Sequence, residues 1–312
     1  MGSLPVGLER LVRLVVEEHP ASDLAIPRTQ AGIWEPFTYC AFIGANRLEA
    51  EASYLHQMMD SHGLLRMDEV LKHRIQWANR VRVVARKQMR KLKPGRKLGL
   101  LSAFANSQVD DLNRCLLEAA NYFRSMKVSR SFIRERTRSR EDTEAFVCEI
   151  YHPNSDHHIF NVGLTRTILW LQSFGLALDL CPPSRQVVKF VNEDLGADIR
   201  PSFYDEDQDM REVRANDWLC MAKVRRVAEQ LTGEFQEPIT TRDVGLAVWY
   251  YKSCQSLLAR FRTGLRRKFT PATLTGFLDS KRWNLNRLSD LLCDIDEIDE
   301  LTIELKDFTS ST

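Results

Sequence analysis

The stretch from residue 161 to residue 196 joins a short glycine-containing turn, two helix-like runs and a rigid loop. In the turn "IFNVGLTRT", Gly163 can take a positive φ without a Cβ penalty, and Asn161 is among the few other residues that tolerate it. Such a turn leaves backbone N–H groups unpaired at the start of the following helix. Those donors and the helix dipole suit a phosphate, and Arg166 could add charge. An ordinary interhelical turn accounts for the same residues.

The loop between the two runs contains Cys181-Pro182-Pro183-Ser184. Ser184 can cap the next helix, and the paired prolines stiffen its entry, which suits a loop that must hold a reacting group. Arg185 and Lys189 lie one turn apart on that helix and could grip a phosphate or pyrophosphate, although a solvated helix face is the alternative. Asp179 supplies the nearby carboxylate, which could accept a proton.

Histidines offer weaker candidates. His157 and His158 follow Asp156 just before the turn, so a metal or proton-transfer site is conceivable. No further ligand has the right spacing, which favours a solvated loop. His56 and His62 fit helix-surface or buried positions. We therefore expect neither a bound metal nor a cofactor.

Composition favours a folded chain of 312 residues, 44% of them hydrophobic. The net charge of +2 hides basic runs at residues 80–97 and 124–140, and acidic runs at 205–209 and 294–300. There are 7 cysteines and no CxxC pair, which argues against zinc ribbons, iron–sulfur loops and disulfide scaffolds. This cysteine usage and the lack of a signal-peptide layout or a transmembrane-length apolar run predict a cytoplasmic protein.

Helical periodicity dominates the chain. Apolar residues recur at helical spacing in Leu8 to Val16, and three amphipathic runs cover residues 110–126, 214–231 and 241–258. The segment Pro36–Met59 reads as helix, turn, helix, with Pro36 as the first helical residue. The sequence therefore predicts an all-α fold, with two helical lobes.

The order of these motifs resembles the helix-hairpin-helix DNA glycosylase superfamily, from about Trp34 to about Leu258. Its early helix opens with Pro-Phe, as Pro36-Phe37 does here, and a late helix carries a tryptophan, here Trp249. The resemblance implies a core at residues 34–262, between an N-terminal helix and linker (1–33) and a helical, acidic C-terminal tail (263–312). It also implies double-stranded DNA as partner. The DNA contacts would come from residues of two turns: Asn46, Arg47, Asn161, Gly163, Thr165 and Arg166.

Departures from that family concern its chemistry. The family's catalytic aspartate would fall at about Pro182 to Ser184, where no acid stands, and Asp179 lies a few residues early. The lysine of bifunctional members is replaced by Thr165 or Arg166, and the iron–sulfur loop is missing. With these differences, the chain resembles the α-glutamyl/putrescinyl thymine pyrophosphorylases of phage-type DNA hypermodification.

That resemblance implies a transferase that acts on an extruded base in the cytoplasm of a bacterial or phage-infected host cell. It would displace pyrophosphate from an activated 5-hydroxymethyl pyrimidine with an amine or amino acid, through Asp179, Ser184, Arg185 and Lys189. A DNA N-glycosylase using Asp179, or a non-enzymatic helical DNA-binding or interaction protein, are the alternatives.

Overall fold

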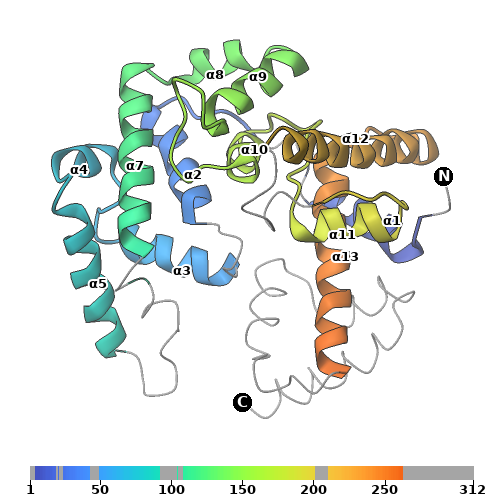
Figure 1. The fold of residues 1–312 in the computed structure, drawn as a ribbon, viewed down its shortest axis with the longest axis horizontal. Coiled ribbons are helices and arrows are strands. Elements are labelled where there is room, and N and C mark those ends of the chain that lie inside the picture. Colours follow the sequence, from blue (N-terminus) through green and yellow to red (C-terminus); the bar gives the residue numbers. More distant parts are fainter. Residues whose placement is uncertain are drawn as a thin grey trace. The chain divides into compact units, whose positions relative to one another are not determined.

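The computed structural model describes residues 4–18, 20, 24–42, 49–91, 104, 108–200 and 210–262. In these ranges every regular element is a helix, so the expected all-α class is confirmed (Figure 1). The helices are α1 (Val6–Glu18), α2 (Gln30–Phe42), α3 (Glu49–Asp60), α4 (Met67–Lys72), α5 (Trp77–Lys91), α7 (Gln108–Ser125), α8 (Arg130–Arg136), α9 (Arg140–Tyr151), α10 (Leu164–Gln172), α11 (Arg185–Glu193), α12 (Met210–Phe235) and α13 (Thr241–Arg262).

The chain divides into two compact units. One comprises Met1–Leu24 and Ala177–Thr312, and the other comprises Ala25–Leu176. The first unit therefore joins α1 to α11, α12 and α13, whereas the second contains α2 to α10. The boundaries at residues 33 and 262 suggested by sequence stay a prediction.

The unit of residues 25–176 is built around the indole ring of Trp170 on α10, which is fully buried. Its Nε1–H donates to the backbone carbonyl of Ile33 on α2 at 3.2 Å. Four phenylalanine rings surround it at centroid distances of 5.5 to 6.2 Å: Phe37, Phe123, Phe146 and Phe174. Edge-on and tilted ring pairs of this kind add to the free energy gained by burial. One side chain of α10 therefore connects α2, α7 and α9.

Helix α2 begins earlier than expected. The sequence predicted Pro36 as its first residue, but α2 starts at Gln30 and Pro36 lies inside it. The Gln30 side chain donates from Nε2 to the carbonyl oxygens of Phe123 (3.1 Å) and Val128 (3.0 Å), which holds this early start against the end of α7. The longer helix also buries Trp34. These interactions offset the backbone hydrogen bond that an interior proline removes.

In the other unit α13 packs against α1, α11 and α12. The expected apolar stripe of α1 is buried, at Leu8, Leu11, Val12 and Val15. These side chains share one core with Val187, Val188 and Val191 of α11 and with the inner faces of α12 and α13. Burial of apolar side chains from all four helices stabilises the unit, at about 1.5–3 kcal/mol for each fully buried large side chain.

Replacing Trp170 with phenylalanine tests its role as the centre of the core. We expect the free energy of unfolding to fall by about 2–4 kcal/mol, because the smaller ring leaves a void and removes the hydrogen bond from the indole N–H to the Ile33 carbonyl. Urea unfolding at an unchanged denaturant slope measures this loss. Val83→Ala, at a side chain that is 63% exposed, is the control and should change stability by less than about 0.5 kcal/mol. Equal stability of Trp170→Phe and the wild type would contradict the role of the indole.

Candidate functional site

The turn between α9 and α10 has the left-handed residue that the sequence predicts, but at one position only. Asn161 has φ of 59°, as expected. Gly163 does not: its φ is −80° and its ψ is 174°, so the expected positive φ at Gly163 is wrong. The single αL residue is enough to reverse the chain because the apolar neighbours Val162 and Leu164 are both buried, which fixes the path through Gly163.

Gly163 is instead the N-cap of α10, and no side chain caps this helix start. A Cβ built at Gly163 would meet no atom within 4 Å, so the space beside the helix start is open. The first backbone N–H groups of a helix have no partner within the helix, and with the dipole they attract an anion. The half-buried Thr165 lies in this first turn. The arrangement can hold a phosphate oxygen close to the backbone.

Glu118 of α7 holds the loop before the turn in place. Its Oε2 accepts from the backbone N–H of Phe160 at 2.6 Å, and its Oε1 accepts from Arg114 Nε at 2.9 Å. The Arg114 guanidinium also lies 4.0 Å from the centre of the Phe160 ring. A charged hydrogen bond and a cation–π contact thus fix the loop beside Asn161, so that the start of α10 is a stable feature.

Arg166, which the sequence predicts as a DNA contact, binds the backbone of the turn itself. Its Nη1 donates to the backbone carbonyl of Asn161, so it braces the turn from within. Burial lowers the pKa of the Arg166 guanidinium below its ordinary value, with opposing effects from the nearby thiols of Cys115 and Cys40. Burial likewise raises the pKa of each of these two thiols to about 12, which keeps them neutral.

The loop from Ala177 to Ser184 is fastened to α12 and α13. Arg225 donates to the carbonyl oxygen of Asp179 from Nε at 3.3 Å and from Nη2 at 3.2 Å. The backbone N–H of Arg242 donates to the carbonyl of Leu178 at 2.9 Å. Contacts from α12 and α13 therefore fix the path of the main chain at the half-buried Asp179. This agrees with a loop that positions a reacting group.

Gly245 on α13 allows the loop to approach. A Cβ at this position would lie 2.3 Å from the Sγ of Cys181 and 3.2 Å from its Cβ. Cys181 is fully buried, and burial raises the pKa of its thiol well above the ordinary value. Glycine destabilises a helix interior by about 1 kcal/mol relative to alanine, so its presence here has a packing reason. An isolated glycine within the apolar pattern of residues 241–258 was the sequence signal for this contact.

Ser184 performs the capping role that its type and position predict. It is the N-cap of α11, and its Oγ accepts from the backbone N–H of Val187 at 3.4 Å. Arg185 is exposed at the first position of the helix, and Lys189 is half-buried one turn later. The Nζ of Lys189 lies 3.8 Å from Glu193 Oε1, a loose surface pair. The two cations thus share one side of α11.

The C-terminal end of α11 is tied to α13 by a buried lysine. Lys252 Nζ lies 3.1 Å from Glu193 Oε2 and 2.5 Å from Asp194 Oδ2, and only 2% of its side chain is exposed. A buried ammonium requires such partners. Glu193 forms ion pairs with Lys189 of its own helix and with the buried Lys252 of α13. It therefore links a surface cation of α11 to the contact between α11 and α13.

Several other candidates lie elsewhere. Asn46 and Arg47 fall outside the described residues. The ring of His56 is buried and its Nε2 lies 2.9 Å from Thr38 Oγ1, while burial lowers its pKa. His157 Nε2 lies 3.8 Å from Glu149 Oε1. Among the described residues, no group of three or more His, Cys, Asp or Glu side chains could hold a metal ion.

Trp249 lies on α13, packed against the core of its unit. No described helix is both long enough and apolar enough to cross a lipid bilayer. No protein-family model, curated protein or solved structure matches the chain.

Gly245→Ala tests whether the loop depends on this close approach. The added methyl must displace the buried Cys181 side chain, so we expect the free energy of unfolding to fall by about 1–3 kcal/mol. The control is Gly233→Ala on α12, where a Cβ meets nothing within 4 Å and alanine should stabilise by up to about 1 kcal/mol. Adding Cys181→Ala to Gly245→Ala should recover part of the loss in a double-mutant cycle. If Gly245→Ala and Gly233→Ala changed the free energy of unfolding equally, the close contact between Gly245 and Cys181 would be contradicted.

Proposed function

We propose that the protein binds double-stranded DNA at the turn between α9 and α10 and acts on a base extruded from the duplex. The favoured reaction is group transfer: an amine or amino acid displaces pyrophosphate from an activated 5-hydroxymethyl pyrimidine. One observation carries the DNA-binding part of the proposal. The start of α10 at Gly163 is uncapped and open, next to a turn that Arg166 and Glu118 brace.

The proposed reaction forms one bond and breaks one. The amine nitrogen attacks the methylene carbon attached to the pyrimidine ring, and the bond from that carbon to the pyrophosphate oxygen breaks. Pyrophosphate leaves with the electron pair, and the proton lost by the amine passes to the Asp179 carboxylate. Arg185 and Lys189, which share one side of α11, would stabilise the charge on the leaving pyrophosphate. Ser184 would contribute by fixing the start of α11.

The alternative reaction is hydrolysis of the glycosidic bond, with the same Asp179 as its acid or base. Arg225 fixes the main chain at Asp179, and a carboxylate on a fixed loop can serve hydrolysis as well as transfer. Hydrolysis is therefore the second candidate reaction. The two reactions leave different DNA: transfer leaves a larger base attached to its sugar, and hydrolysis leaves an abasic site. A non-enzymatic DNA-binding protein would produce neither change.

Gly163→Val tests the DNA contact. Since φ at Gly163 is −80° and its surroundings are open, valine fits the fold there, but its side chain would obstruct a phosphate at the start of α10. We expect a loss of about tenfold or more in affinity for a short duplex, measured by fluorescence anisotropy, with wild-type binding falling steeply as salt rises. Gly233→Ala on α12, where a Cβ likewise meets nothing within 4 Å, is the control and should bind as the wild type does. Unchanged affinity of Gly163→Val would remove the hairpin from the DNA interface.

Mass spectrometry of nucleosides tests the chemistry. DNA carrying pyrophosphorylated 5-hydroxymethyl pyrimidine is incubated with the protein, with and without amine donors. We expect a new amine-linked nucleoside, absent with Arg185→Ala although that variant still binds DNA. Asp179→Asn should reduce the rate by about tenfold or more with little change in affinity, since it removes the proton acceptor. Alkali-labile abasic sites that disappear with Asp179→Asn would replace the transfer reaction with the glycosylase reaction.

A further inference from the structure

The outer face of α5 carries a dense group of cations that is separate from the hairpin turn. Helix α5 reads "WANRVRVVARKQMRK" and contains no acidic residue. Its inner side is buried through Trp77, Ala78, Val81 and Ala85. We call the four exposed cations of the opposite side the α5 basic face: Arg86, Lys87, Arg90 and Lys91.

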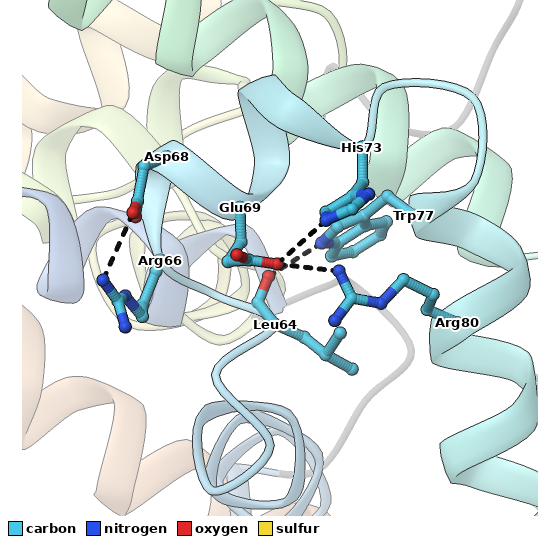
Figure 2. Close-up of polar contacts among 7 residues, drawn as sticks. All are labelled: Leu64, Arg66, Asp68, Glu69, His73, Trp77 and Arg80. Carbon is cyan, nitrogen blue, oxygen red and sulfur yellow. Dashed lines mark hydrogen bonds and ion pairs between the residues drawn. The ribbon is translucent and has the colours of Figure 1, made fainter.

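The corner between α4 and α5 fixes this helix and neutralises its first cation (Figure 2). The indole Nε1–H of Trp77 donates to the carbonyl of Leu64 at 2.7 Å. Glu69 on α4 accepts from Arg80 Nη1 at 2.7 Å and lies 3.3 Å from His73 Nε2. The hydrogen bond from Arg80 lowers the pKa of Glu69 below its ordinary value. Arg80 is therefore part of the fold rather than of an open charged surface.

The next cation is also paired, but the basic face is not. Arg82 donates to Asp110 on α7. In the described part of the chain, no acidic side chain forms an ion pair with Arg86, Lys87, Arg90 or Lys91. Every charged residue from Val70 to Val109 is basic. Like charges one turn apart on a helix repel each other, which destabilises the helix unless an anion neutralises them.

The density of these cations suits a polynucleotide. A helix rises about 1.5 Å per residue, so the four cations of the α5 basic face lie within about 8 Å along the helix axis. One strand of a duplex presents a phosphate about every 3.4 Å along its axis. An extended array of phosphates can therefore pair with several side chains at once, whereas a single small anion can pair with only one or two.

From this charge complementarity we infer that the α5 basic face is a second DNA-binding surface, which contacts the phosphate backbone independently of the hairpin turn. The inference rests on the proposed DNA-binding function and assigns to it a further contact. Asn79 and Val83 of α5 line an open cavity of about 610 Å³, together with Gln76 just before the helix. Val83 is 63% exposed and lies one helical turn before Arg86 and Lys87.

The test replaces the four cations of the α5 basic face by glutamine in the full-length chain. The matched control replaces four exposed cations elsewhere in the same unit and so removes the same charge: Arg124, Lys127, Arg134 and Arg138. Circular dichroism and thermal unfolding confirm that both variants fold. Binding of a short fluorescein-labelled duplex of arbitrary sequence is measured between about 50 and 200 mM salt.

We expect the α5 variant to bind at least tenfold more weakly at low salt. The slope of log affinity against log salt should become shallower by about 3, since each lost phosphate contact contributes about 0.9. The control variant should change the slope by less than about 1. Equal behaviour of the two variants would overturn the inference, because net charge alone would then explain the loss. Equally tight binding of polyglutamate by the wild type would also overturn it.

Comparison with Gly163→Val separates this inference from the proposed function. Loss of binding in the α5 variant but not in Gly163→Val supports the α5 surface and contradicts the hairpin contact. Loss in Gly163→Val but not in the α5 variant has the opposite meaning. A wild-type protein that fails to bind the duplex at low salt contradicts both.

Discussion

The burial of the Trp170 indole is the interaction on which the geometry of the hairpin depends. The ring contacts phenylalanines of α2, α7 and α9, and its N–H donates a hydrogen bond to the carbonyl of Ile33. Because Trp170 lies near the end of α10, these contacts fix the axis of that helix and leave its other end, at Gly163, at the surface. An anion site made of backbone groups needs such a fixed axis, since the direction of the N–H groups is the direction of the helix. The apolar core around Trp170 therefore sets the direction of the backbone N–H groups at the start of α10.

The turn before α10 and the loop before α11 differ in how closely other residues pack against them. The turn before α10 has empty space beside Gly163, whereas the loop before α11 has none beside Cys181, because Gly245 lets α13 approach it closely. Open space suits an external ligand, and close packing suits a loop whose position must not vary. Arg225 adds two hydrogen bonds to the carbonyl of Asp179, and Lys252 fixes the far end of α11. Proline stiffness, which the sequence offered as the reason for rigidity, is therefore supplemented by contacts from α12 and α13.

Periodicity and residue type predicted much of this fold. The apolar stripe of α1 and the Ser184 cap follow from local rules, and both are present. The errors lie where tertiary contacts decide. The burial of Val162 and Leu164 determines that Asn161 alone, and not Gly163, takes the left-handed conformation. The contacts of Gln30 with the end of α7 override proline as a helix start. The isolated Gly245 in an apolar helical pattern indicates a close approach, but its partner Cys181 is too distant in sequence for a local rule to identify.

Cations show most clearly why charge must be read from structure. The formal net charge is only +2, yet individual arginines have very different settings. Arg166 and Arg225 donate to backbone carbonyls, and Arg80 is neutralised by Glu69, so these guanidinium groups stabilise the fold. The cations of the α5 basic face have no such partners among the described residues. At ordinary salt, exposed charges interact over about 10 Å, so neighbours on one helix face act together while distant acids are screened. A nearly neutral chain can therefore present a strongly positive surface to a phosphate backbone, because an approaching polyanion responds to local charge rather than to the total.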